Sequence, residues 1–422
     1  MGGSLLDLAG IDLVDPDGYV ERVPFEWFDR LRREAPVCWH DEPPPNHGFW
    51  AVTRYDDLVA VHMDWRTYSS ELGAVALEEL EPDQLEVRKT MLETDPPRHR
   101  ELRNLTHKRF TPRGVARYEE YVREVTRSVL DRALPKGEFD FVREISRELP
   151  IRVLCLMLGA PDEDADRLIE WGDRMIGHQD PEYSDAVVDR VDTEAYRLLP
   201  FRSPAALEVF AYADVMRDAR RRDSLDDVVA ALATAEVGGA PLTDHEYHNY
   251  FSLLMIAGNE TTRHTISHGM LALMENPDQM DKLRSRPDDP RLWQRAVEEI
   301  LRWATPVMHF RRTATRDTEL RGQRIRAGDK VVTWYVSANV DETVFPDPYR
   351  FDVERWPNEQ VTFGPGGPHF CLGAHLARLE TKVMFQELLP RLRSIELAGP
   401  VERMRSNFVN GIKHMPVRAR TG

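Results

Sequence analysis

The stretch Phe363-Gly-Pro-Gly-Gly-Pro-His-Phe-Cys371-Leu-Gly373 places four glycines and two prolines directly before a helical pattern over residues 374–389. Glycine and proline at this density exclude regular structure and let the backbone approach a neighbouring group closely. Cys371 ends the loop where the helix begins, and the free N–H groups and positive dipole end there are expected to lower the pKa of a thiol. The sequence therefore predicts a loop that presents a thiolate.

Two interpretations of Cys371 are open. A free cysteine is most often a small buried residue of the core. A thiolate on a glycine-rich loop is also the strong electron-donating axial ligand that a heme iron needs. The glycines at 364, 366, 367 and 373 favour the ligand, because a core cysteine does not need them.

Length, composition and charge exclude several classes of protein. The 422 residues, 41% of them apolar, can bury a large core, and no composition break marks a linker, so we expect one domain over residues 1–422. Cys38, Cys155 and Cys371 are too widely spaced for a disulfide framework or a zinc site and fit a reducing cytosol. The net charge of −16 disfavours nucleic-acid binding. We see no signal peptide and no apolar run of membrane-spanning length, and expect a cytoplasmic monomer without a membrane anchor.

Periodic apolar residues predict a mainly helical chain with a minor β part. Helices are expected at 24–34, 55–63, 143–158, 161–176, 203–222, 224–235, 290–303 and 373–389. Another is expected to open at Thr111-Pro112, with one apolar face made by Val115, Tyr118, Val122, Val125 and Val129. Strands are expected at 49–54, 307–313, 319–320 and 330–335, with a hairpin over 401–418 that turns near Asn410-Gly411. Residues 65–95 are predicted to be a long irregular segment.

One predicted helix is much longer than the others. Thr243 and Glu246 form a capping box, and the helical pattern continues to Glu275, just before Pro277. At the standard rise per residue this helix would be about 50 Å long and would cross an entire domain. In its middle, the polar run 257–262 (Ala-Gly-Asn-Glu-Thr-Thr) interrupts the apolar residues.

Four motifs occur in the order typical of one family. They are the run at 257–262, the pair Glu299 and Arg302 on one helix face, the stretch 338–355, and the cysteine loop. Together they resemble the cytochrome P-450 monooxygenases over nearly the whole chain. The resemblance implies the fold of that family, a single triangular prism, mainly α with a minor β part. It also implies heme b (iron protoporphyrin IX) between the long central helix and the cysteine loop.

The resemblance assigns Cys371 as the iron ligand, with the N–H of Gly373 tuning the sulfur. Phe363 would pack near the thiolate. It stands eight residues before the cysteine, one more than in most members, which leaves the local path of the loop open. The pair Glu299 and Arg302 would brace the segment behind the heme.

On the opposite side of the heme, Glu260 and Thr261 would be an acid–alcohol pair that relays protons, beside Ala257. Thr261 can donate a hydrogen bond back to the carbonyl of Ala257 and bend the helix. The alternative is that Glu260 and Thr261 are ordinary exposed helix residues.

The two propionates of heme need cationic partners. His99 and Arg103, one helical turn apart, together with Arg312 and His369, match the propionate contacts of the family. Arg311 could compete with Arg312. Each of these residues could instead be a solvated surface group.

The chain has no dinucleotide fingerprint or flavin signature, so the electrons that reduce O2 would come from a separate ferredoxin- or flavodoxin-type donor with its reductase. Basic residues on elements that flank the cysteine side in this family form a candidate docking surface: Arg100, Lys108, Arg109, Arg113, Arg378 and Lys382. Scattered solvated charges are the alternative.

The segments that line the substrate pocket in this family are largely apolar here, with His309 as a polar point. The candidates are Leu72, Val75, Leu77, Leu254, Ala257, Val307, Met308, Phe310, Phe408 and Val409. Such a pocket suits a lipophilic substrate, although the same residues could be core. The resemblance implies hydroxylation of an unactivated C–H bond of a terpenoid, steroid or branched lipid. Polyketide or other secondary-metabolite tailoring, a peroxygenase and a non-catalytic heme protein remain alternatives.

Overall fold

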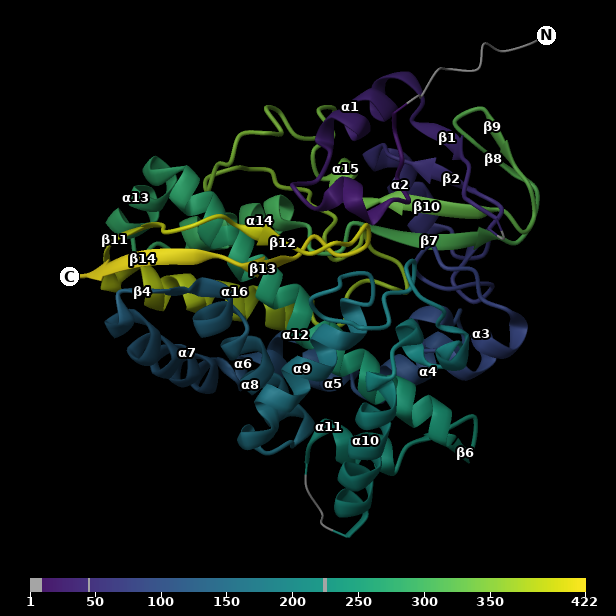
Figure 1. Cartoon of the computed structure of the whole chain (residues 1–422), viewed down its shortest axis with the longest axis horizontal. Coiled ribbons are helices and arrows are strands. Elements are labelled where there is room, and N and C mark those ends of the chain that lie inside the picture. The colour runs from purple at the N-terminus through teal and green to yellow at the C-terminus, as the bar shows by residue number, and fades with distance from the viewer. Residues whose placement is uncertain (1–9, 45, 223–225) are drawn as a thin grey trace.

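The computed structural model describes residues 10–44, 46–222 and 226–422 (Figure 1). Helices are the main component of this part of the chain. They are α1 (Phe25–Glu34), α2 (Tyr55–Met63), α3 (Pro82–Arg88), α4 (Arg98–Asn104), α5 (His107–Phe110), α6 (Pro112–Ala116), α7 (Glu119–Ala133), α8 (Glu148–Leu158), α9 (Ala165–Ile176), α10 (Ala205–Arg222), α11 (Val228–Ala233), α12 (Asp244–Glu275), α13 (Pro277–Ser285), α14 (Pro290–Ala304), α15 (Tyr335–Ala338) and α16 (Ala374–Leu388).

The strands form one larger sheet and several small ones. The larger sheet has the order β1 (Val37–His40), β2 (Phe49–Val52), β10 (Lys330–Trp334), β7 (His309–Ala314) and β3 (Tyr68–Ser69), and only its β2–β10 pair is parallel. A second sheet has the order β11 (Leu392–Leu397), β14 (Pro416–Thr421) and β4 (Glu138–Asp140). The two-stranded pairs are β5 (Glu236–Val237) with β6 (Ala240–Pro241), β8 (Thr318–Leu320) with β9 (Gln323–Ile325), and β12 (Glu402–Arg403) with β13 (Ile412–His414).

The long helix α12 runs through the centre of the molecule, between the helices in the lower half of Figure 1 and the sheet at the upper right. Its predicted capping box is present, because the Glu246 N–H donates to Thr243 Oγ1 at 3.2 Å and the Thr243 N–H donates to Glu246 at 2.9 Å. Helix α12 packs against α8, α9, α10, α14 and α16. A long central helix that packs against five other helices gives the fold one axis around which a site can be built.

The mainly helical architecture and the central helix confirm the predicted fold, and three local predictions are corrected. The irregular segment 65–95 contains α3, which opens with its own capping box at Glu81 and Gln84. The helix expected from Thr111 onward is broken into α6 and α7 around Arg117. The hairpin expected over 401–418 is short: β12 and β13 enclose a loop at 404–411, and β14 leaves to join β11 and β4.

Two remaining predictions lie partly outside this description. Residues 224 and 225 of the helix expected at 224–235, and residues 1–9, where no signal peptide is expected, lie outside the described residues. That residues 1–422 form one domain stays a prediction. Among the described residues, no helix is both long and apolar enough to cross a membrane.

Candidate active site

The cysteine loop is closed by a backbone hydrogen bond and shaped by glycines. The Cys371 N–H donates to the carbonyl of Phe363 at 2.9 Å. Gly366 and Gly367 have φ angles of +135° and +76°, which residues with side chains rarely adopt. A Cβ on Gly367 would lie 2.9 Å from the backbone oxygen of His62, at the end of α2. The lengthened loop therefore fits against α2 only because glycine occupies this position.

Burial dominates the environment of the Cys371 thiol. It raises the pKa of Cys371, whereas the N–H groups of Gly373 and Ala374 and the guanidinium groups of Arg103 and Arg378 lower that pKa. The expected net lowering of the pKa by the helix N-terminus is therefore wrong, because desolvation outweighs the helix end. A thiolate at this position needs a bound metal cation, which deprotonates a coordinating thiol outright.

Cys371 opens into a large cavity between the cysteine loop and α12. Ala257, Thr261 and Thr265 line it from α12, and Phe363, Cys371 and Gly373 line it from the loop side. The remaining lining is mostly apolar and comes from α5, α8, α11, α12, α14, α16 and the segment before α4: Met91, Phe110, Pro150, Leu154, Met157, Leu158, Val228, Leu253, Leu301 and Leu376. The predicted iron ligand and the predicted alcohol thus face one apolar chamber.

The sequence left open the position of Phe363 in the lengthened cysteine loop. Phe363 lines the cavity, and the Arg378 guanidinium carbon is 4.5 Å from the centroid of its ring. Arg378 is itself held by Glu298, through hydrogen bonds of 2.6 and 3.0 Å. Phe363 and Cys371 both line the cavity, and the backbone hydrogen bond between them closes the loop.

The cavity carries one buried and one half-buried arginine, and neither forms an ion pair with a carboxylate of the described chain. Arg103 and Arg312 both line it, and burial lowers the pKa of each guanidinium. His99 and His369 also line it, with ring centroids 4.2 Å apart, and the Nε2 atom of each has no hydrogen-bond partner within the described part of the chain. Uncompensated buried cations and donors on one wall suit an anionic ligand.

The competition between the two neighbouring arginines of β7 is decided by the strand. Arg311 points away from the cavity and donates to the Glu79 carboxylate at 3.1 Å and to the Glu78 carbonyl at 2.9 Å. Arg312 faces the cavity, with His62 Nδ1 3.2 Å from its Nη2. Successive strand residues point to opposite faces, so only one of the two can reach the cavity.

These features fit heme. The unneutralised cationic wall suits its propionates, and Cys371 offers the axial sulfur. Ala257 is exposed although it lies in the middle of α12, and no atom lies within 4 Å of where a Cβ on Gly373 would be. Space therefore remains open between the helix and the loop for a flat ligand.

Thr261 and Glu260 lie on different faces of α12. The Thr261 hydroxyl donates to the Ala257 carbonyl at 2.9 Å, which confirms the predicted back-bond, and Thr261 lines the cavity. Glu260 is outside the cavity lining and faces α9, where a Cβ on Gly172 would lie 3.1 Å from its Oε1. The side chains of consecutive helical residues point about 100° apart. Two residues that are adjacent in a sequence motif therefore need not face the same cavity. Glu260 is buried rather than an exposed helix residue, and its role as the acid of the pair stays a prediction.

Glu260 is held in a buried polar network. It accepts hydrogen bonds from Arg263 and, at 3.0 Å, from Asn259, and Arg263 also binds Asp173 at 2.7 Å. Burial raises the pKa of Glu260 to about 8, although Arg263 and Asn259 act to lower it. His264 Nε2 lies 3.7 Å from the Glu260 carboxylate. Glu260 is thus a constrained group rather than a free acid of the cavity.

Five of the ten residues predicted as substrate contacts line the cavity: Val75, Leu254, Ala257, Val307 and Phe310. Leu72 is 53% exposed on the surface. Met308 and Val409 are buried in the core, and Phe408 packs against His309 and Phe310. Leu77 is also core, and His309, fully buried against Trp334, is not a polar point of the cavity. An apolar residue type alone does not show whether a residue lines the cavity or lies in the core behind it.

Sequence reasoning missed several polar residues of the cavity. Thr262, Thr265, Tyr335 and Glu380 all line it. Tyr335 binds His62, with 3.1 Å between the hydroxyl oxygen and Nε2. Glu380 lies two helical turns after the start of α16, one turn beyond Leu376 and Ala377, which also line the cavity. That helical spacing is the one sequence signal that could have identified it.

The basic residues predicted for partner docking lie on α4, α5, α6 and α16, and both α5 and α6 pack against α16. Three of them are tied to acids: Arg109 to Asp226, Arg378 to Glu298, and Lys382 to Glu119 at 3.8 Å. The other three are exposed, and no acidic partner is found for them in the described chain: Arg100, Lys108 and Arg113.

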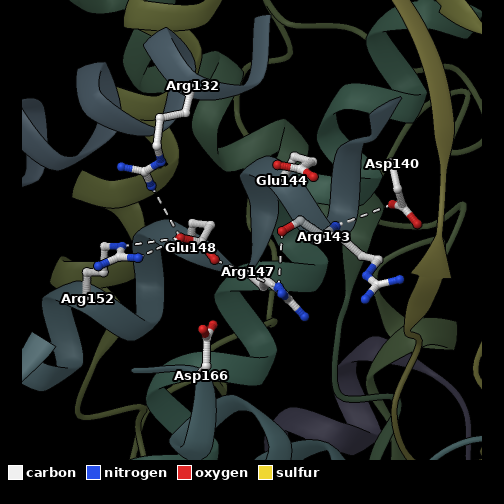
Figure 2. A pocket seen from close by; sticks show the side chains of 8 residues that line it. All are labelled: Arg132, Asp140, Arg143, Glu144, Arg147, Glu148, Arg152 and Asp166. Atoms are coloured by element: carbon white, nitrogen blue, oxygen red, sulfur yellow. Dashed lines mark hydrogen bonds and ion pairs between the residues drawn. The ribbon is translucent and has the colours of Figure 1, made fainter. Parts of the chain in front are cut away.

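A second pocket lies on the surface near α7, α8 and α9 and contains none of the predicted site residues (Figure 2). Its lining is entirely charged: Arg132, Asp140, Arg143, Glu144, Arg147, Glu148, Arg152 and Asp166. Glu148 accepts hydrogen bonds from Arg152 at 2.9 Å and from Arg132 at 3.4 Å. Equal numbers of acids and arginines make this a self-compensated ionic cluster.

Comparison with known proteins agrees with this geometry. The Cytochrome P450 family model matches residues 206–414. The steroid C26-monooxygenase of Mycobacterium tuberculosis strain H37Rv is 37% identical over 97% of this chain and 92% of its own length. The methyl-branched lipid omega-hydroxylase of the same strain is 39% identical over 92% of this chain and 90% of its own.

A solved structure of a Mycobacterium marinum cytochrome P450 in complex with pseudoionone superposes with a TM-score of 0.88 at 40% identity, covering 98% of this chain and 100% of that one. A Bacillus megaterium P450 in complex with testosterone superposes with a TM-score of 0.81 at 30% identity, covering 94% and 98%. Identity of this extent over almost the full length means that the chain belongs to the cytochrome P450 family, as a heme b monooxygenase that uses O2 and an external electron donor.

Proposed function

We propose that this enzyme hydroxylates an unactivated C–H bond of a steroid or a methyl-branched lipid. The observation that carries the proposal is the apolar chamber between Cys371 and Thr261, because an apolar cavity favours a lipophilic guest. The similarity to steroid and methyl-branched lipid hydroxylases supports the same substrate class. Val75, Leu254, Val307 and Phe310 would contact the substrate.

In this proposal Cys371 ligates the iron, while His99, Arg103, Arg312 and His369 hold the propionates. When bound, the heme supplies the redox chemistry that activates O2. Thr261 keeps its hydroxyl lone pairs toward the cavity, because its proton is donated to Ala257. The Thr261 hydroxyl oxygen would accept hydrogen bonds from water and so orient that water for proton transfer. Glu260, held by Arg263, would exchange protons on the side of α12 that faces away from the cavity.

We further propose a cytoplasmic monomer that takes electrons from a ferredoxin-type donor. The exposed residues Arg100, Lys108 and Arg113 on the cysteine side support an acidic docking partner.

The test is a binding and turnover screen of the purified holoenzyme. Sterols, methyl-branched fatty acids, linear fatty acids, terpenoids and macrolides are titrated while the Soret band is followed for displacement of the iron-bound water. Ligands that bind are then turned over with a ferredoxin and its reductase, and the products are identified by mass spectrometry. Hydroxylated sterol or branched lipid is expected. Selective binding and oxidation of macrolides instead would overturn the proposal and favour polyketide tailoring.

A further inference from the structure

His264 is a buried histidine of α12 that none of the predicted site motifs includes. Its side chain is 0% exposed, and the Ile412 N–H of β13 donates to its Nδ1 atom at 3.2 Å. Burial, and after it the positive charge of Arg263, lower the pKa of His264 well below its usual value, so the ring is neutral at physiological pH. A neutral ring that accepts at Nδ1 carries its one proton on Nε2.

The Nε2 atom of His264 faces the carboxylate of Glu260, one helical turn earlier. The two groups are 3.7 Å apart, and Nε2 has no hydrogen-bond partner within the described part of the chain. A buried N–H group without an acceptor costs free energy. Because a hydrogen bond needs about 3.2 Å or less, a movement of about 0.5 Å satisfies both the Nε2–H and the carboxylate.

The charged and titratable groups around Glu260 leave a distinct part for His264. Arg263 donates to Glu260 and also to Asp173 on α9, at 2.7 Å. Burial, and to a lesser degree the nearby acids Asp173 and Glu260, raise the pKa of Tyr183 in the segment after α9. Arg263 thus serves two carboxylates already, whereas the Nε2–H of His264 serves no acceptor of the described residues.

The ring of His264 is held in place by the chain around β13. The Ile412 N–H fixes its Nδ1 atom, and a Cβ on Gly411 would lie 3.0 Å from its Cε1 atom. The backbone therefore packs directly on the ring at a residue without a side chain. The Nε2 edge of the ring is left directed at Glu260.

We propose that His264 is a positioning residue for Glu260, whose Nε2–H stabilises the carboxylate form of that acid. The inference rests on the proposed function, in which Glu260 exchanges protons. A hydrogen-bond donor beside a carboxylate favours the charged form, so His264 opposes the effect of burial on Glu260. An acid that gains and loses a proton in each turnover needs both forms to be accessible. His264 itself stays neutral and transfers no proton.

The first test measures the protonation of Glu260. The carbonyl stretch of its protonated form is identified in infrared spectra of the holoenzyme as the band that E260Q removes, and its intensity is followed against pH. In H264L the midpoint should rise by about one pH unit, because the variant removes a donor to the carboxylate. In H264Q, whose amide N–H replaces the Nε2–H, the midpoint should stay close to the wild-type value. An unchanged midpoint in H264L would overturn the proposal.

H268L is the matched control. His268 is also buried on α12 and binds the same loop, with its Nε2 atom 3.0 Å from the Asn410 carbonyl oxygen, but it lies two turns away from Glu260. The midpoint of Glu260 should not move in H268L. An equal rise in H264L and H268L would overturn the proposal, because loss of either buried histidine would then have the same effect.

A second variant keeps the test valid if H264L does not fold. H264N keeps an acceptor for the Ile412 N–H but has no N–H at the position of Nε2. The midpoint of Glu260 should rise in H264N as in H264L, and an unchanged midpoint there would count equally against the proposal.

Turnover separates this inference from the proposed function. Product formed per electron pair should fall several-fold in H264L and recover in H264Q if Glu260 exchanges protons in catalysis. A raised midpoint in H264L with unchanged product per electron pair would support the link between His264 and Glu260 but contradict the proton role of Glu260. The infrared titrations need no substrate, so they do not depend on the steroid or lipid proposal.

Discussion

Glu299 and Arg302 form a fully buried ion pair on α14, with both side chains 0% exposed. The Arg302 Nε and Nη2 atoms each donate to one Glu299 carboxylate oxygen at 2.8 Å. Arg302 also donates to the Asn339 carbonyl at 2.8 Å, and Glu299 accepts from Arg355 at 3.1 Å. The pair connects α14 to residues between 339 and 358, the segment that leads into the cysteine loop.

Glu299→Ala should destabilise the protein strongly. Removing one partner leaves the Arg302 charge buried and uncompensated, which costs about 3–5 kcal/mol. Denaturant unfolding followed by circular dichroism measures this. The control is Glu26→Ala, which breaks the exposed Arg22–Glu26 pair of 2.9 Å and should change stability by only about 0.5 kcal/mol. Equal effects of the two substitutions would contradict a bracing role for Glu299.

Cys371→Ser should abolish the red-shifted Soret band of the ferrous–CO complex, because that shift requires a thiolate ligand. Cys38→Ser and Cys155→Ser are the controls. Neither Cys38 nor Cys155 lines the cavity that Cys371 faces, so neither can offer a sulfur ligand there. Retention of the band in Cys371→Ser would assign the ligand to one of the other two cysteines.

Thr261→Ala should uncouple electron consumption from product formation. The substitution removes the hydroxyl oxygen that faces the cavity and accepts hydrogen bonds there. Product per electron pair should fall several-fold, and hydrogen peroxide should accumulate. Thr261→Ser keeps the hydroxyl group and should stay close to the wild type. Full coupling in Thr261→Ala would remove Thr261 from the proton path.

The parts of the site that were predictable from the sequence are those in which local pattern fixes the geometry. The capping box of α12, the glycines before Cys371 and the Glu299–Arg302 spacing are local, and the structure contains all three. The direction of Glu260, the burial of Met308 and the isolation of Glu380 depend on which elements pack together. Such tertiary contacts are not visible in the local sequence. The environments of these residues could therefore be determined only from the structure.

Stability should depend on pH through Glu380. Burial raises its pKa to about 8 in the folded state from 4.5, so the folded protein holds this proton more tightly than the unfolded chain. This contribution is fully present below the unfolded pKa and is lost as pH rises through about 8. Between these two pKa values, each unit of rising pH lowers the free energy of unfolding by up to about 1.4 kcal/mol.

E380Q should therefore flatten the pH profile of stability relative to the wild type, whereas E387Q should keep the wild-type slope. Urea unfolding of the holoenzyme at a series of pH values measures both profiles. An identical slope in E380Q and the wild type would mean that Glu380 is ionised in the folded protein.

Charge reversal of the exposed basic residues near the cysteine loop should slow reduction of the iron. Lys108 and Arg113 are suitable targets because, unlike Arg109 with Asp226, they have no acidic partner in the described chain. Stopped-flow reduction by a ferredoxin should be roughly tenfold slower in the Lys108→Glu, Arg113→Glu double variant at low ionic strength. The difference should shrink as salt screens the charges. Arg326→Glu, an exposed change beyond β9, is the control, and an equal slowing there would reduce the effect to net charge rather than a docking surface.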